Sequence, residues 1–233
     1  MKRNILLVIF LIFGMNSLFS QVKPFRFGVK VAPDFAWISP DTKDYENDGM
    51  VPGFSWGFLA DITLTENYFV KTGFSVDYLG GKLSYPHAML LDESATEPTT
   101  GTLKRKYNLR YLEIPATIKM RTNQFNNMAF YGEIGFGGYF NLKAKGKDEF
   151  TPDGSSTVVS DDGDIKDEIS FMRASMIVGA GMEYFIDEST SLIFSVDFNN
   201  GLTNVLNGKN NIDASLNERA QLYYFQLNVG VMF

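Results

Sequence analysis

The chain has 233 residues, no cysteine, one histidine and a formal net charge of −6. The lack of cysteine excludes a disulfide scaffold, and the negative charge argues against nucleic acid as a partner, because phosphate binding needs a basic face. Aromatic residues make up 15% of the chain, and together with 21 glycines they are typical of many short strands rather than helices.

Residues 1–20 have the pattern of a secretory signal peptide. Lys2 and Arg3 precede an apolar run over residues 5–13, and a short polar exit ends at Ser20. We expect cleavage after Ser20 and a single mature domain over residues 21–233. Within that domain no stretch has the roughly 18 continuous apolar residues that a membrane-spanning helix needs. The domain is therefore expected to be either soluble in the periplasm or a β-barrel in the outer membrane.

Eight segments alternate between apolar and polar residues, as strands do. We expect strands near residues 22–37, 54–64, 70–78, 112–120, 128–140, 172–184, 192–199 and 223–233. The connections alternate in length along the chain. Long polar segments lie near residues 38–52, 80–105, 141–169 and 200–218, and short turns near 65–67, 121–127 and 187–190. Short periplasmic turns and long extracellular loops are typical of outer-membrane barrels.

The two faces of these predicted strands differ in charge. From Phe25 onward, one face of the eight segments carries no charged residue. To the other face we assign five basic and six acidic residues: Arg26, Lys30, Lys71, Lys119, Arg173, Asp61, Asp77, Glu113, Glu133, Glu183 and Asp197. A soluble sandwich would bury the apolar face, whereas a membrane barrel would turn it toward lipid. Alternation alone leaves both architectures open.

Three features favour the barrel. The strands reach the roughly 9–11 residues that a tilted strand needs to cross a bilayer. Aromatic residues stand near strand ends, as in an interfacial girdle: Trp37, Tyr68, Tyr78, Tyr107, Tyr184 and Tyr223. The last strand, with Tyr223, Phe225 and a final Phe233, resembles the signal read by the outer-membrane assembly machinery. We therefore predict an all-β, eight-stranded antiparallel up-and-down barrel in the cell outer membrane, with outer-membrane lipid and the assembly machinery as partners.

The inward face of such a barrel should be filled by its own side chains, because eight strands enclose only a narrow interior. Buried opposite charges should pair, since an unpaired buried ion is costly. We expect ion-pair networks that fill the lumen, built at mid-height from Lys30, Glu113 and Glu133 and nearer the outside from Asp77, Arg173 and Asp197. A structural role is the preferred interpretation, and a proton or ion path is the alternative. An open pore is not expected.

The sequence offers few groups for chemistry. Its one histidine, His87, stands in a long polar segment with no acid or base placed to orient it, so we expect no catalysis there. The acidic run DYENDG at 44–49 resembles the start of a calcium loop, but Ser55 stands where the final glutamate is expected. Solvated acidic loops are favoured over weak cation binding. We expect no enzymatic activity, no cofactor and no metal site.

A short motif stands in the fourth predicted strand. Its residues are Tyr111, Leu112, Glu113, Ile114 and Pro115, followed by Lys119. This YLEIP sequence resembles the PorT family of outer-membrane barrels, and the first strand, FGVKVAPDFAW, also fits that family. The resemblance is specific around residues 107–147. Because proline cannot donate to a strand ladder, we expect Pro115 at a bulge or kink.

The resemblance implies a function in protein transport. A PorT-like barrel would be a non-enzymatic accessory component of type IX secretion that supports the export of surface and secreted proteins, with other type IX components as partners. The alternative is a surface-exposed barrel that uses its long extracellular loops for adhesion or ligand binding. Both interpretations are compatible with the sequence.

Overall fold

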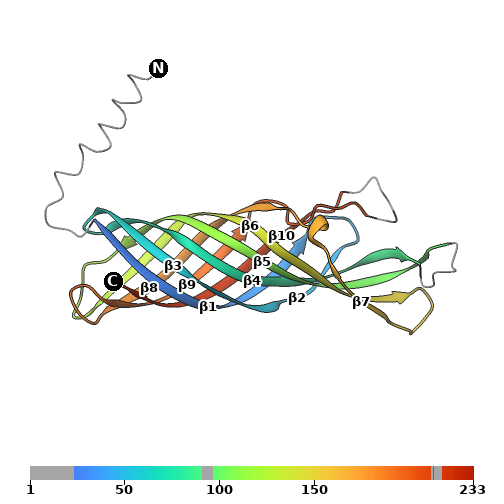
Figure 1. The fold of residues 1–233 in the computed structure, drawn as a ribbon, viewed down its shortest axis with the longest axis horizontal. Helices are drawn as coiled ribbons and strands as arrows, with labels where there is room; N and C mark the ends of the chain where they lie inside the picture. Colours follow the sequence, from blue (N-terminus) through green and yellow to red (C-terminus); the bar gives the residue numbers. More distant parts are fainter. Residues whose placement is uncertain (1–23, 91–96, 211, 213–216) are drawn as a thin grey trace, which may run out of the picture.

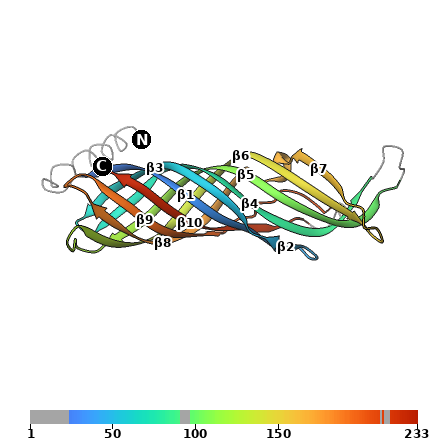
Figure 2. The same ribbon diagram turned by 90° about the horizontal axis from the view of Figure 1, so that it is seen from below.

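Eight long strands close into a ring in the computed structural model, which describes residues 24–90, 97–210, 212 and 217–233 (Figures 1 and 2). In ring order they are β1 (Phe25–Pro40), β3 (Val51–Thr65), β4 (Tyr68–Met89), β5 (Thr99–Arg121), β6 (Met128–Pro152), β8 (Met172–Phe185), β9 (Ser191–Gly201) and β10 (Ala220–Met232). Neighbours pair antiparallel, and β10 pairs with β1 to complete the ring. The prediction of an eight-stranded antiparallel up-and-down barrel is confirmed. The predicted signal peptide, residues 1–20, lies outside the described residues.

Three short elements lie above the ring, on the side of the long connections. Strand β2 (Glu46–Gly49) pairs with the upper part of β4, and β7 (Val159–Asp164) pairs with the upper part of β6. The 3₁₀ helix η2 (Lys166–Glu168) follows β7. Among the described residues, no helix is long and apolar enough to cross a membrane.

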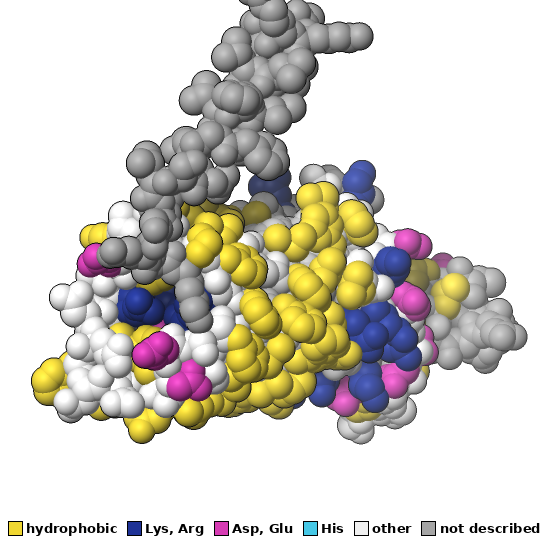
Figure 3. All heavy atoms as spheres, turned by 60° about the vertical axis from the view of Figure 1, so that its left-hand side comes forward, with side chains coloured by type: hydrophobic (Ala, Val, Ile, Leu, Met, Phe, Trp, Pro, Cys, Tyr) yellow, Lys and Arg dark blue, Asp and Glu magenta, His cyan; other side chains and the backbone are white. Residues whose placement is uncertain are grey.

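An apolar belt surrounds the outside of the barrel. The strands alternate buried and exposed residues, and the exposed parity is the apolar one: Phe27 is 57% exposed, Phe74 44% and Phe136 62%. Figure 3 shows these hydrophobic side chains as a yellow band with polar and charged groups at both of its margins. A belt of this kind is stable when lipid covers it. The start of β1, the C-terminus and the short turns lie at one end of the barrel, which is the periplasmic end in this class.

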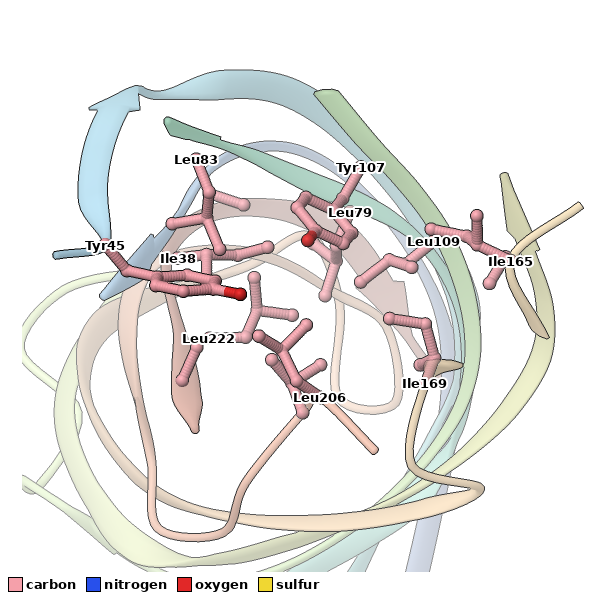
Figure 4. Packing of buried hydrophobic residues seen from close by; sticks show 14 of the residues in the cluster. Ile38, Tyr45, Leu79, Leu83, Tyr107, Leu109, Ile165, Ile169, Leu206 and Leu222 are labelled. Carbon is pink, nitrogen blue, oxygen red and sulfur yellow. The ribbon is translucent and has the colours of Figure 1, made fainter. Parts of the chain in front are cut away.

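The segment near residues 80–105 is mostly strand, not loop as expected. Strands β4 and β5 continue past the belt as a hairpin that pairs as far as Met89 and Thr99. Inward-facing side chains of this extension pack with side chains of β1, β10 and the neighbouring loops, and Figure 4 labels residues of this buried cluster. Leu83, Leu103 and Phe150 are fully buried in this cluster. The polar composition of this segment had suggested a loop. Its strands are stabilised by the burial of apolar side chains inside the extension.

Two details of the sequence reading are wrong. Tyr107 does not belong to an interfacial girdle, because it faces inward and is only 2% exposed. Pro115 does not mark a bulge, since the pairs Lys71 with Thr117 and Ser75 with Glu113 keep a single register on either side of it. The β4–β5 ladder is instead interrupted between these pairs, where proline has no N–H to donate. The β-bulge of this wall lies higher, where the β5–β6 register shifts at residues 110–111.

Candidate functional site

The inward face of the barrel is a dense polar core. The eleven charged residues predicted to face inward are all buried, each at most 9% exposed. Sequence reasoning missed Asp34, which is fully buried and lies on the same parity of β1 as Lys30. Its carboxylate accepts hydrogen bonds from Ser55 and from Gln226. The alternation in β1 was the signal that could have identified it.

The layer nearest the periplasm contains most of the ion pairs found in the described part of the lumen. Lys119 Nζ donates to Asp61 Oδ2 at 2.7 Å and also to Glu183. Glu183 Oε2 further accepts from Arg26 Nη1 at 3.0 Å and from Arg121 Nη1 at 3.1 Å. Because one carboxylate serves three cations here, these residues connect strands that do not touch in the ring.

The middle layer contains one ion pair and several hydrogen bonds. Lys71 Nζ lies 2.6 Å from Glu133 Oε1, and Thr117 donates to the same carboxylate. Lys30 Nζ donates to the side-chain oxygen of Gln226 at 2.7 Å. The cavity left between these side chains has a volume of about 10 Å³. This is about the space of one water molecule, so the lumen is filled at this height.

The upper layer contains two carboxylates and an aromatic cage. Ser75 Oγ lies 2.8 Å from both Asp77 and Glu113, and Tyr139 donates to Glu113 at 2.7 Å. Arg173 stacks on the ring of Tyr139, with its guanidinium carbon 3.7 Å from the ring centre. The guanidinium nitrogens of Arg173 have no hydrogen-bond partner among the described residues.

The six residues predicted to form ion-pair networks do not pair with one another in the described part of the chain. Glu133 pairs with Lys71 instead. Lys30 donates to an amide, and Arg173 stacks on an aromatic ring. Asp197 accepts a hydrogen bond at 2.7 Å from the amide of Asn228. The heights were also wrong for Asp197, which lines the middle cavity together with Lys30, Glu113 and Glu133.

The motif residues are split between the two faces of β5. Leu112 and Ile114 face outward, whereas Tyr111, Glu113, Pro115 and Lys119 are buried on the lumen side. The predicted assembly signal lies on the outward side of β10 and meets neighbouring aromatic rings. Tyr223 stacks on Trp37 with ring centres 5.8 Å apart, and Phe225 lies 5.9 Å from the same ring. Phe233 contacts Phe27 across the closing pair of strands.

The described residues contain no group of three or more His, Cys, Asp or Glu side chains that could hold a metal ion. His87 is half-buried between the rings of Tyr85 and Phe150, with centres 6.0 and 6.4 Å away. Burial lowers the pKa of His87, so the imidazole is neutral at pH 7. In the acidic run, Asp48 pairs with Lys104 at 3.7 Å.

Ion pairs and a stacked pair of aromatic rings stabilise the extracellular extension. Arg105 forms ion pairs with Asp148, at 2.6 Å, and with Glu168. Burial acts to lower the pKa of Arg105, but the hydrogen bond to Asp148, together with the nearby Tyr85 and Tyr107, holds it above its usual value. Tyr45 stacks on Tyr85 with ring centres 4.3 Å apart. The loops above the barrel are therefore fixed to the β4–β5 hairpin.

The periplasmic mouth contains an open cavity of about 590 Å³. Arg121 lies over the ring of Phe69 at 4.7 Å and is one of its lining residues. Asp187 stands on its rim in the turn before β9. Hydrogen bonds from the backbone N–H groups of Ser189 and Thr190 lower the pKa of Asp187 to about 2. The mouth is thus polar and structured.

Comparison with known families agrees with this architecture. The family described as "Outer membrane protein beta-barrel domain" matches residues 19–207. The chain belongs to this family. As a member of this outer-membrane β-barrel family, the protein is located in the cell outer membrane. Among curated proteins, none matches the chain significantly.

Several solved outer-membrane proteins are similar to this barrel. Neisserial surface protein A is 12% identical with a TM-score of 0.46, over 90% of this chain and 96% of its own. Ail of Yersinia pestis is 14% identical with a TM-score of 0.38, over 91% of this chain and 100% of its own. The outer membrane protease OmpT of Escherichia coli is 8% identical with a TM-score of 0.35, over 92% of this chain and 99% of its own.

Proposed function

We propose that the protein is a non-enzymatic, surface-exposed binding protein that acts through the extracellular extension of its barrel. The observation that supports this most is the packed core inside the extension, which includes Leu83, Leu103 and Phe150. A barrel that only spans the membrane has no need of such a core. The lumen cavity of about 10 Å³ also leaves no room for a solute to pass. Partners would therefore meet the protein at its surface.

The extension is suited to recognition because its shape is held before a partner arrives. Arg105 joins β5 to β6 and to η2 through its two acidic partners. Ordering a loop on binding costs free energy, so a pre-ordered surface binds more tightly than a mobile one. Apolar side chains remain exposed on the extension, with Leu90 57% and Val158 52% exposed. These are groups that a bound partner could cover.

Shortening the hairpin tests this proposal. Tyr85 and Leu103 are directly opposite in the β4–β5 ladder, so residues 86–102 can be replaced by a two-residue Asn-Gly turn. Purified wild-type and shortened proteins in lipid nanodiscs would be applied to arrays of extracellular-matrix proteins and glycans. We expect ligand binding by the wild type and its loss in the shortened protein. An unchanged binding profile would contradict the proposal. Retention of the folded band in unheated gel electrophoresis is the control.

A second function, accessory component of type IX secretion, is favoured by the YLEIP resemblance. The motif itself lies in the wall and lumen, where Glu113 and Lys119 are buried. A periplasmic partner would have to dock elsewhere. The periplasmic mouth supports this role, because its cavity of about 590 Å³ is lined by Arg26, Arg121 and Asn127 and opens toward the periplasm.

Deletion of the gene in its host tests the secretion role. We expect type IX cargo to accumulate in the periplasm and to return to the medium on complementation with the wild type. Complementation with the shortened-hairpin protein separates the two functions, since a role at the periplasmic mouth does not need the extension. Cross-linking from Glu66 and Asn126 in the turns would then capture the partner. Normal export in the deletion strain would refute the secretion role.

A further inference from the structure

Five basic side chains gather on the outer wall of the barrel just above the lipid belt. The patch consists of Lys82, Lys106, Arg110, Lys143 and Lys145, all on the outward parity of β4, β5 and β6. Among the described residues, none of the five forms an ion pair within 4.0 Å. Figure 3 shows a cluster of dark-blue basic side chains at the right-hand margin of the yellow belt.

The strand register places like charges directly opposite one another. Arg110 is the ladder partner of Lys143. Lys106 lies between Lys82 on one side and Lys147 on the other, which makes a row of three lysines across three strands. Like charges directly opposite each other in a sheet are destabilising. The arrangement therefore favours a bound anion that offsets the repulsion.

Two of the nearby acidic residues form ion pairs with lysines that lie just above the patch. Lys104 pairs with Asp48 at 3.7 Å, and Lys147 pairs with Asp162 at 3.1 Å. Asp164 is the ladder partner of Lys145 but forms no ion pair with it, and its carboxylate accepts a hydrogen bond from the backbone of η2. Positive charge is thus left uncompensated toward the membrane.

The height of the patch matches the lipid headgroups. On β5 the outward residues run from Met120 up to Leu112, and Arg110 is the next. Eight residues at about 3.4 Å each span about 27 Å along the strand, or about 21 Å along the barrel axis at a tilt of about 40°. This is close to the apolar band of about 25 Å in outer-membrane barrels. Arg110 and Lys143 therefore lie where the outer-leaflet phosphates begin.

A groove of about 660 Å³ connects the patch to the belt. Phe54 and Tyr78 line it on the side of the belt, and Arg110, Lys143 and Lys145 line it above. Arg110 is held against the ring of Tyr78, with its guanidinium carbon 4.6 Å from the ring centre. Its Nε is buried and has no hydrogen-bond partner in the part of the chain that the structure describes. The groove therefore places apolar side chains beside basic groups that form no ion pair. This arrangement is complementary to a lipid, in which an acyl chain lies close to a phosphate.

The opposite wall lacks this arrangement. Near the upper ends of β1, β9 and β10, the outward residues are the uncharged Ser39, Asn200 and Gln221. A surface that faced the membrane uniformly would distribute its charges around the ring. We propose that the groove over β3 to β6 is a binding site for one phosphorylated lipid of the outer leaflet, with its phosphate on Arg110, Lys143 and Lys145. This site is independent of the functions proposed for the extension and the periplasmic mouth.

The test measures lipid binding to the full-length mature protein in detergent micelles by native mass spectrometry. The probes are diphosphorylated lipid A and the same lipid A after removal of its phosphates. The variant is R110Q/K143Q/K145Q. The matched control, K43Q/K166Q/R219Q, removes three exposed positive charges from the extracellular loops outside the groove. Heat-dependent gel mobility shows that each protein is folded.

We expect phosphorylated lipid A to bind the wild type and the control equally, and the groove variant on the order of 100-fold more weakly, since each basic residue near an anionic surface contributes about fivefold. Dephosphorylated lipid A should bind weakly to all three. Equal affinity of the groove variant and the wild type would overturn the proposal. Displacement of the lipid by excess inorganic phosphate would also overturn it, because the site would then hold a free anion rather than a lipid.

Discussion

Replacement of Lys119 by methionine tests whether the buried ion pairs stabilise the barrel. Lys119 is only 2% exposed, and its ammonium group bridges Asp61 and Glu183. Methionine has a similar length but no charge, so Asp61 would lose its ionic partner inside the lumen. Glu183 would keep Arg26 and Arg121, at 3.0 and 3.1 Å. The substitution therefore leaves one carboxylate, not two, without a cation.

Loss of one member of a buried ion pair costs about 3–5 kcal/mol. Because Glu183 remains compensated, we expect the lower end of this range, a decrease of about 3 kcal/mol in the free energy of unfolding. Replacing Asp61 by asparagine in the same protein removes the stranded charge. The double variant, Asp61→Asn with Lys119→Met, should recover more than half of the loss. The two substitutions should thus be strongly non-additive.

The measurement is urea-induced unfolding of the refolded barrel in detergent, followed by the fluorescence of Trp37 and Trp56. The midpoint and slope of the transition give the free energy of unfolding. Lys43→Met is the control, because that side chain is 80% exposed and should contribute little. The reasoning would be refuted if the free-energy costs of the two single substitutions summed, within about 0.5 kcal/mol, to the cost of the double substitution. Such additivity would mean that Lys119 and Asp61 do not depend on each other.

Three further predictions concern the turns, the wall and the extension. The pKa of Asp187 is lowered to about 2, so the charged carboxylate stabilises the folded state. This stabilisation is fully present above the unfolded pKa of 3.8 and is lost as the pH falls through about 2. The difference in melting temperature between wild type and Asp187→Asn should therefore vanish over that pH range. Gly73→Ala should lower the free energy of unfolding by about 1–3 kcal/mol, because Gly73 has a φ of +141° and a Cβ would meet the carbonyl oxygen of Phe58. Gly132→Ala should be nearly neutral in the same urea assay, because a Cβ there would make only an ordinary contact, at 3.8 Å, with the carbonyl oxygen of Gly179. Arg105→Met should accelerate proteolysis of the extension without changing the unfolding midpoint of the barrel, since its ion pairs lie above the belt; unchanged proteolysis would show that the apolar core alone holds the extension.

Assignment of the two strand faces succeeded from the sequence because the side-chain period of a strand is two. Phe27 lies in the belt and Glu133 in the lumen as the alternation predicts. The ends of the strands were not predictable in the same way. Strands β4 and β5 continue beyond the membrane because Leu83 and Leu103 pack against loops distant in the sequence. No local pattern records that contact.

The ion pairs themselves were beyond sequence reasoning. Lys119 on β5 meets Asp61 on β3 and Glu183 on β8, and neither strand is a neighbour of β5 in the ring. These contacts cross the lumen, so they depend on the tilt and stagger that set the height of each residue. Alternation gives the direction in which a side chain points but not its height. The charges were identified correctly as a set, and their partners were not.

The basic patch follows from the same periodicity, once the strands are allowed to continue past the membrane. On β5 the outward parity that carries Ile114 and Leu112 goes on directly to Arg110 and Lys106. If β5 is predicted to end at the apolar belt, these basic residues fall in a loop, where a charged side chain is solvated and needs no ion-pair partner. On a strand they have fixed neighbours, and the register sets Arg110 against Lys143. The outward face of β5 thus changes from apolar to basic along its length. This change matches the boundary in the membrane between acyl chains and lipid phosphates.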